Sequence, residues 1–315
     1  MTELLLPMLA QTSFTEYKAI FLMQGFAGLS LFSVFLLMSL GLAIIFGQMR
    51  VINMAHGEFL TLGAYVTAMF SHYVEANHVG FMPYFFPFAV AGAFVATFIV
   101  GWLVEWSLIR YLYQRPLDTL LATWGVSMVM QEGFRQLFGA RETSATLPEW
   151  LMGSWAPTED IDIPLNGLLM LGMAIGMMAL VYVLLYRSRW GMRVRATTLN
   201  RAMAGAVGIN TKMTDRVTFA LGCGLAGVAG AGFTTIGSVS PTAGQAYIVD
   251  TFIVVVFGGA GSLIGTLISA FTIGQAQSIL EFFLSGVLAK VVVLVTVIVL
   301  LMIRPQGLIA AKVRR

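Results

Sequence analysis

The sequence predicts an all-α fold, a polytopic bundle of transmembrane helices that forms a single transmembrane domain over residues 1–315. Of these residues 58% are hydrophobic and only 10% are charged, whereas soluble domains are about 25% charged. Mean hydropathy is +0.85. The apolar runs continue for about twenty residues, enough for a helix to cross the hydrocarbon core, whereas the strands of a barrel would alternate over about ten residues.

The apolar runs place the helices along the chain. They mix Leu, Ile, Met, Ala and Phe freely, which is typical of membrane spans. A less regular region follows the last continuous run and ends in Val287–Ile303. The continuous runs are Phe21–Phe46, Phe59–Val74, Phe85–Ile109, Leu117–Phe138, Leu165–Tyr186 and Val217–Ile236.

The irregular region indicates a broken or re-entrant helix. The run Tyr247–Phe257 is too short to span at about 1.5 Å per residue, and it meets Gly258–Ser262 before Leu263–Phe271 resumes. Such a break is tolerated where protein or water satisfies the opened backbone. Phe46-Gly47 before the first interruption echoes Phe257-Gly258 before the second. Paired interruptions of this kind favour an inverted repeat around a central path.

The loop charges predict how the chain is oriented. Residues 187–216 are strongly basic, with Asp215 as their only acidic residue, whereas residues 139–164 are acidic. Because cytoplasmic loops are enriched in Lys and Arg, we expect a basic cytoplasmic loop at 187–216 and an acidic external loop at 139–164. Alternation then places the N-terminus outside and the C-terminus in the cytoplasm. The net charge of +3 follows from this topology and indicates no nucleic-acid partner.

Polar residues between the first two apolar runs are the main candidates for function. Asn53, His56 and Glu58 stand where the chain otherwise looks membrane-embedded, and ionisable groups at bilayer depth usually face a bundle interior or a water-filled path. Two interpretations remain open. These groups either seal the cytoplasmic end of a hairpin by bonding loop backbone, or sit at a broken helix facing a two-fold interface. In the second case Glu58 accepts bonds from loop amides and fixes an inner gate.

The basic loop contains a short amphipathic helix, predicted over Thr198–Val207 and closed by Gly208-Ile209-Asn210, where Gly or Asn can adopt the left-handed cap. This helix is suited to dock into a groove of another protein. Alternatively, the arginines of the loop only enforce topology and bind anionic headgroups of membrane lipid. The chain has no G-x-x-x-x-G-K-[ST] loop for nucleotide phosphates. Its single cysteine, Cys223, rules out an internal disulfide and any cysteine-based metal cluster, so we expect no metal and no cofactor in this chain.

Several stretches resemble a known family. Gly41–Gly47, Val51–Phe59 and Gly63-Ala64-Tyr65 together are similar to the signature of the permeases of branched-chain amino-acid type ABC importers. Two further stretches look like the urea-importing branch of that family, Arg115–Gly125 and Gly244–Gly259. The ending Ala289–Leu308 is similar too.

The resemblance implies a transport subunit, not an enzyme, in a bacterial-type inner membrane. Its implied partners are a second homologous permease in a heterodimer, two cytoplasmic ATPases that hydrolyse the ATP, and an extracytoplasmic substrate-binding protein. Alternating access driven by the ATPases would then import urea, or alternatively branched-chain amino acids. The residues that the resemblance assigns to ATPase coupling are Arg195, Arg201, Ala202, Gly205, Gly208 and Ile209.

Two other classes of function stay open. An ATP-independent channel or carrier for a small solute is compatible with the membrane spans. An intramembrane enzyme is disfavoured because His56-Gly57-Glu58 is not the His-Glu-x-x-His arrangement of a zinc protease.

Urea is small, planar and neutral, so its path needs amide, hydroxyl and backbone partners more than charge. Besides the three polar residues above, the predicted path residues are Thr123, Trp124, Gln131, Gln245, Tyr247 and Asp250. Trp124 is either a core residue or a ring that narrows a pore. Gln245, Tyr247 and Asp250 alternatively form an external mouth that contacts only the binding protein.

Overall fold

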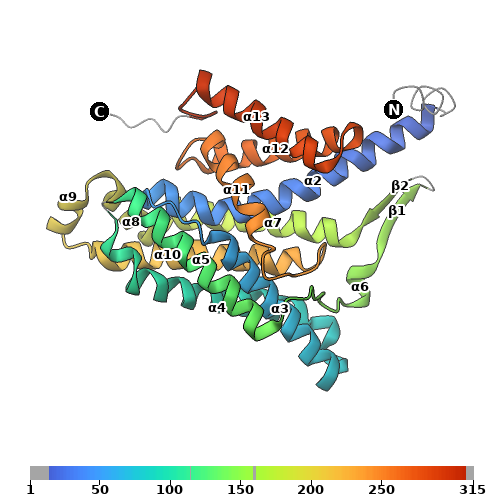
Figure 1. Cartoon of the computed structure of the whole chain (residues 1–315), viewed down its shortest axis with the longest axis horizontal. Helices are drawn as coiled ribbons and strands as arrows, with labels where there is room; N and C mark the ends of the chain where they lie inside the picture. The colour runs from blue at the N-terminus through green and yellow to red at the C-terminus, as the bar shows by residue number, and fades with distance from the viewer. Residues whose placement is uncertain (1–13, 114, 159–160, 310–315) are drawn as a thin grey trace.

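The computed structural model describes residues 14–113, 115–158 and 161–309. These residues form an elongated helical bundle with one short β-hairpin (Figure 1), which confirms the predicted all-α class. The basic residues 187–216 lie at one end of the bundle, called here the basic end. Residues 139–158 and 161–164 lie at the other, called the acidic end.

The elements follow the predicted runs closely. A π-helical turn at Ile45–Met49 prolongs the first helix, and 3-10 turns at Val79–Tyr84 and Ile109–Tyr111 flank the third. The helices are α2 (Phe14–Ile44), α3 (His56–Asn77), α4 (Phe85–Ser107), α5 (Pro116–Phe138), α6 (Glu149–Met152), α7 (Leu165–Tyr186), α8 (Arg189–Leu199), α9 (Arg201–Ala206), α10 (Thr211–Phe233), α11 (Gln245–Gly258), α12 (Leu263–Phe283) and α13 (Gly286–Ile303); the antiparallel strands are β1 (Ser154–Thr158) and β2 (Ile161–Pro164).

Within the described residues, six helical segments are long and apolar enough to cross a membrane: Ile20–Met49, Val79–Tyr111, Leu165–Tyr186, Thr211–Phe233, Leu263–Phe283 and Gly286–Ile303. The predicted spans Phe59–Val74 and Leu117–Phe138 are helical, as α3 and α5, but are not among these six. Both helices carry more polar residues than the six apolar segments. In α5, Thr119, Thr123 and Ser127 form a buried polar stripe.

The helices alternate between the two ends. α2 begins at the acidic end and α13 finishes at the basic end, while the chain termini lie outside the described residues. The expected separation of the basic and acidic loops is therefore present in the fold. Which end faces the cytoplasm remains the prediction made from the charges.

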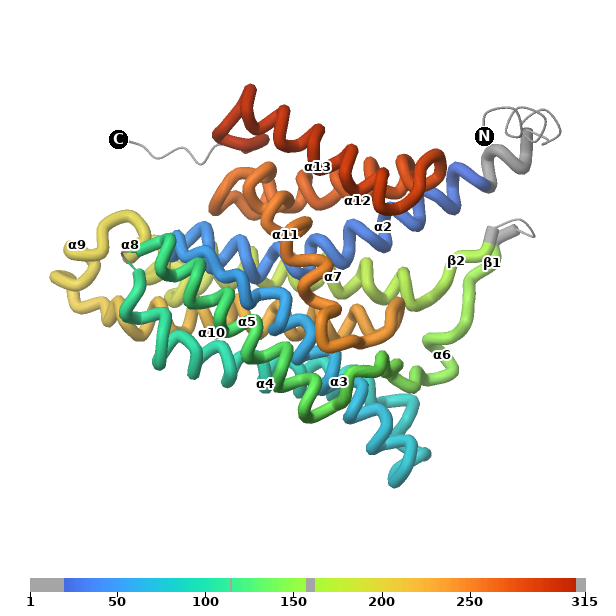
Figure 2. The backbone as a smooth tube through the Cα atoms, viewed as in Figure 1, coloured from blue at the N-terminus to red at the C-terminus, as the bar shows by residue number. Residues whose placement is uncertain are grey.

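Two helices begin inside the bundle instead of at either end (Figure 2). After the π-helical turn, residues 50–55 turn back along α2 without helical structure, and α3 starts beside Met38, about three turns before the end of the π-helix. The segment that corresponds to residues 50–55 in the second half of the chain is residues 234–244, which follow α10 and lead to α11. The Gly244 amide donates to Thr61 Oγ1 at 2.9 Å, so α11 starts against the first turns of α3.

The contact between these two helix starts is a contact of backbone on backbone. A Cβ added to Gly244 would lie 1.8 Å from the Gly57 carbonyl oxygen, and a Cβ on Gly57 would lie 2.4 Å from the Gly244 oxygen. Only glycine fits at these two positions, and for this reason the starts of α3 and α11 can touch.

The second interruption lies earlier than the sequence indicated. Gly258–Ser262, interpreted above as a break within one helix, is a turn at the basic end, where the Leu308 amide donates to the Phe257 oxygen at 2.7 Å. Gly259 and Gly261 take φ of +99° and +86°, which allows this sharp turn. α12 then continues to Phe283 without interruption. The interruption equivalent to residues 50–55 is residues 234–244, so the Phe46-Gly47 and Phe257-Gly258 echo does not mark equivalent positions.

α10 occupies the centre of the bundle and packs against α4, α3 and α2. Its buried glycines allow these close approaches: a Cβ on Gly227 would lie 2.2 Å from Thr97 Oγ1, and a Cβ on Gly63 would lie 2.2 Å from the Gly227 oxygen. Cys223 is fully buried against Gly101, as expected of a small packing residue.

We expect Gly244→Ala to lower the free energy of unfolding by about 1–3 kcal/mol, because the new methyl group overpacks the contact with Gly57. Unfolding of the purified protein in mixed micelles measures the change. Gly176→Ala in α7 is the matched control, since no atom lies within 4 Å of the added Cβ. Equal stability of the two variants would contradict the contact.

Candidate functional site

Glu58 stands at the centre of a buried polar cluster between α3 and α5. Its Oε1 accepts hydrogen bonds from Gln131 Nε2 at 2.7 Å and from Ser127 Oγ at 3.0 Å, and the residue is 1% exposed. The donors to the Glu58 carboxylate are thus side chains of α5. The expectation that loop amides donate to Glu58 is wrong. The carboxyl group fastens the first turn of α3 to α5.

His56 and Asn53 hold the same helix start from its other sides. His56 Nε2 lies 3.0 Å from the Met38 oxygen of α2, and Asn53 Oδ1 accepts from the Ala55 amide at 3.1 Å. Both residues are fully buried. Within the described residues, Asn53 Nδ2, His56 Nδ1 and Glu58 Oε2 have no hydrogen-bond partner. The cluster therefore has polar atoms in the bundle interior that are free to form further hydrogen bonds.

Thr123 fixes the non-helical segment that precedes α3. Its Oγ1 accepts from the Met54 amide at 3.0 Å and lies 3.3 Å from the Ile52 oxygen, so one hydroxyl serves the backbone on both sides of Asn53. Ser127 was missed by the sequence analysis, although it follows Thr123 and precedes Gln131 at spacings of four residues on one helix face. Trp124, in contrast, is half exposed on the outside of α5 and is not a core residue.

A second polar group joins α11 to α13. Asp250 is buried and pairs with Lys290 at 2.6 Å, and Lys290 Nζ also donates to the Ala246 oxygen at 3.0 Å. Tyr247 is partly buried edge-on against Phe233, while Gln245 is exposed. The predicted path residues thus fall into two groups, one at the start of α3 and one at the start of α11.

The predicted coupling helix is two helices instead of one. α8 ends at Leu199 and α9 begins at Arg201, so a single helix over Thr198–Val207 is wrong. Asn200 causes the break, because its backbone is extended and its side chain accepts from the Met203 amide as an N-cap. Gly208 adopts the left-handed conformation, φ +85°, as expected.

The other residues assigned to coupling surround this break. Ala202, Gly205 and Gly208 are exposed, and the Ile209 amide donates to the Ala204 oxygen. The Arg195 guanidinium lies 5.4 Å from the Tyr186 ring centre.

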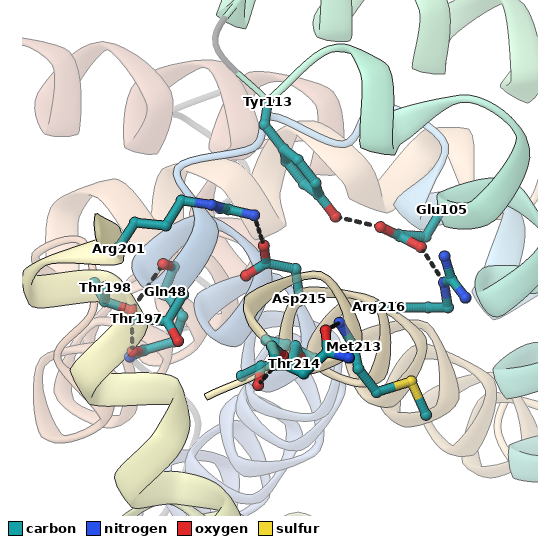
Figure 3. Close-up of polar contacts among 12 residues, drawn as sticks. Gln48, Glu105, Tyr113, Thr197, Thr198, Arg201, Met213, Thr214, Asp215 and Arg216 are labelled. Atoms are coloured by element: carbon teal, nitrogen blue, oxygen red, sulfur yellow. Dashed lines mark hydrogen bonds and ion pairs between the residues drawn. The ribbon is translucent and has the colours of Figure 1, made fainter. Parts of the chain in front are cut away.

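Arg201 points inward, towards a network of charged groups at the basic end (Figure 3). It pairs with Asp215 of α10, and its guanidinium lies 5.3 Å from the Tyr113 ring centre. The Tyr113 hydroxyl donates to Glu105 of α4, whose other oxygen accepts from Arg216 Nε at 2.7 Å. Burial and the Glu105 carboxylate raise the pKa of Tyr113 well above its usual range, so its hydroxyl keeps the donated proton.

A cavity of about 270 Å³ opens beside this network. Its wall is formed by the π-helical turn after α2, the end of α8, the start of α9, Tyr113 and Asp215. Thr198 Oγ1 donates to the Gln48 oxygen at 2.9 Å and so connects α8 to this π-helical turn. Glu105 was not among the predicted site residues, although a lone carboxylate inside the apolar run Phe85–Ile109 is itself a signal of a buried partner.

No group of three or more His, Cys, Asp or Glu side chains in the described ranges is placed to hold a metal ion.

Comparison with known proteins places these features in a family. The family model described as "Branched-chain amino acid transport system / permease component" matches residues 25–302. The high-affinity branched-chain amino acid transport system permease protein LivH of Escherichia coli K12 is 28% identical over 94% of this chain and 97% of its own length.

Two further relatives are similar over most of their length. The probable branched-chain amino acid transport permease protein LivH of Methanocaldococcus jannaschii is 26% identical over 88% of each chain. The permease protein BraD of Pseudomonas aeruginosa is 25% identical over 92% of this chain and 95% of its own length. No solved structure matches the chain.

We expect Glu58→Ala to destabilise the protein by about 1–3 kcal/mol, because the buried Ser127 and Gln131 donors lose their shared acceptor. Unfolding in mixed micelles again provides the measurement. Glu132→Ala, which removes an exposed carboxylate from α5, the helix of the two donors, should change stability by less than about 0.5 kcal/mol. A Glu58 variant as stable as the Glu132 variant would show that the cluster does not hold α3 to α5.

Proposed function

The chain belongs to the branched-chain amino acid transport system permease family and is a multi-pass membrane protein, and we propose that it forms half of the translocation path of an ATP-driven amino-acid importer. The observation that carries this proposal is that α3 and α11 both begin inside the bundle and meet there at Gly57 and Gly244. Interrupted helices that meet at the interior, with polar groups around them, are typical of transport paths.

The path itself is proposed to run along the outer sides of α5 and α11. Asn53, His56 and Glu58 are fully buried and hold the start of α3, which suits a positioning role behind the path better than direct solute contact. Trp124 of α5 and Gln245 of α11 are both exposed. A second homologous permease, facing these surfaces in a heterodimer, would close the path.

The proposed substrates are branched-chain amino acids. The relatives compared above all take their names from this transport. The half-exposed Lys290 and its partner Asp250 add a physical argument, since a zwitterion offers a carboxylate and an ammonium to such a pair. Urea carries no charge and gains less from it. Urea stays a prediction from the sequence stretches that resemble its importers.

Energy is proposed to come from ATPase subunits at the basic end. Leu199, Met203 and Val207 are 77%, 62% and 70% exposed around α9. Exposed apolar side chains gathered in an extramembrane segment favour a protein-binding surface. The basic end would then face the cytoplasm, as the loop charges predict, and the acidic end would receive the substrate-binding protein.

Transport assays test the substrate. In vesicles containing this permease, its homologous partner and the ATPases, with the binding protein supplied, we expect ATP-dependent uptake of labelled leucine. Excess isoleucine or valine should reduce that uptake and excess urea should not, because only the amino acids carry the charges that Lys290 and Asp250 can bind. Uptake of labelled urea that excess amino acids do not reduce would indicate urea as the substrate. Uptake without ATP would indicate a channel.

A single exposed methionine tests the docking surface. We expect Met203→Asp to weaken co-purification with the ATPase about tenfold or more, because burying a methionine side chain contributes about 1.5–3 kcal/mol. Met152→Asp is the control, since Met152 is also largely exposed but lies at the acidic end. If both variants bind the ATPase like the unaltered protein, the surface around α9 is not the docking site.

A further inference from the structure

The short helix α9 packs on α8 and α10, with Ala204 buried in the contact. Ala202, Met203 and Gly205 are exposed, and the half-exposed Arg201 side chain pairs with Asp215 of α10. Its guanidinium also lies over the Tyr113 ring, in the loop between α4 and α5. Arg201 therefore contacts two separate elements of the bundle.

The partners of Arg201 belong to a second ion pair. Tyr113 donates to Glu105, and Glu105 accepts from Arg216, the residue after Asp215. Figure 3 shows two sets of contacts, Arg201 with Asp215 and Tyr113 with Glu105 and Arg216. The Arg201 guanidinium over the Tyr113 ring links them. The two ends of this series of contacts are thus neighbouring residues of α10, the Asp215 carboxylate and the Arg216 guanidinium.

The charges of this network balance. Two arginines face two carboxylates, and the Asp215 and Glu105 side chains are 8% and 1% exposed. Removing the Arg216 guanidinium would leave the buried Glu105 without its charged partner. The half-exposed Arg201 is more screened, so its loss costs less stability. A movement of α9 must therefore either carry Asp215 and Tyr113 along or break the pair between Arg201 and Asp215. The adjoining cavity, which Arg201 lines, gives the side chain room for such a movement.

We propose that Arg201 is a positioning residue that transmits movements of α9 to α4 and α10, and that it is not itself a contact with the ATPase. This inference rests on the proposed function, since it presumes that an ATPase acts at the basic end. The exposed apolar residues around α9 would receive the ATPase, and Arg201 would pass the displacement inward through two ion pairs and the Tyr113 hydroxyl.

Charge reversal and its rescue test this role. Arg201→Asp, Asp215→Arg and the double variant are compared in the complete transporter in liposomes, by uptake and by ATP hydrolysis. Each single variant should lower the ratio of uptake to hydrolysis about tenfold, within the range of coupling between distant sites. The double variant should restore most of that ratio, because the ion pair is re-formed with its charges exchanged. ATPase co-purification should remain unchanged throughout.

Arg193→Asp is the matched control, because Arg193 is an exposed arginine of the same loop and has no ion pair among the described residues. Its ratio should equal that of the unaltered transporter. A ratio lowered as far as in Arg201→Asp would assign the effect to loop charge and overturn the inference. So would single variants with an unchanged ratio, or a double variant no better than the singles.

Two further outcomes are decisive. If the charge reversals prevent assembly, Tyr113→Phe replaces them, because it keeps the ring beneath Arg201 and removes only the donor to Glu105. A lowered ratio in this variant supports the relay and an unchanged ratio overturns it. If the unaltered transporter shows no ATP-dependent uptake of any solute, the proposed function itself fails and the inference fails with it.

Discussion

The contact of Gly57 with Gly244 is the constraint on which the rest of the structure depends. Two helices begin there, within the bundle, and each leaves backbone amides that need acceptors in a place remote from bulk water. Side chains supply them: Asn53 Oδ1 for the chain before α3, Thr123 Oγ1 for Met54, and Thr61 Oγ1 for Gly244 itself. Of the polar stripe of α5, Thr123 meets this need directly, while Ser127 and Gln131 hold Glu58 at the start of α3.

α10 connects this interior to the basic end. Its middle residues pack on α2 and α3, where a Cβ on Gly230 would lie 2.0 Å from the Leu60 oxygen. Its first turns hold Asp215 and Arg216, which carry both ion pairs of the network at the basic end. One rigid, glycine-lined helix thus joins the start of α3 to the residues that hold α9. Close backbone packing leaves little slack, so a displacement at one end of α10 has to be accommodated at the other.

Much of the fold could be predicted from the sequence, and the physical reasons show why the rest could not. Long apolar runs specify helices, and Asn53, His56 and Glu58 among apolar neighbours marked the first interruption. Residues 234–244 were missed because small and polar residues after a span look the same whether they form an outer loop or fold back into the bundle. The Glu105–Arg216 pair joins residues 111 positions apart, and local sequence patterns hold no information on such contacts.

Distances between spin labels test the central claim, that α11 begins in the interior of the bundle. Labels at exposed positions Trp155, Leu199 and Gln245, in a Cys223→Ser background, would mark the acidic end, the basic end and the start of α11. The account predicts that both distances from Gln245 are clearly shorter than the distance between Trp155 and Leu199. A distance from Gln245 to either end as long as the whole bundle would contradict it.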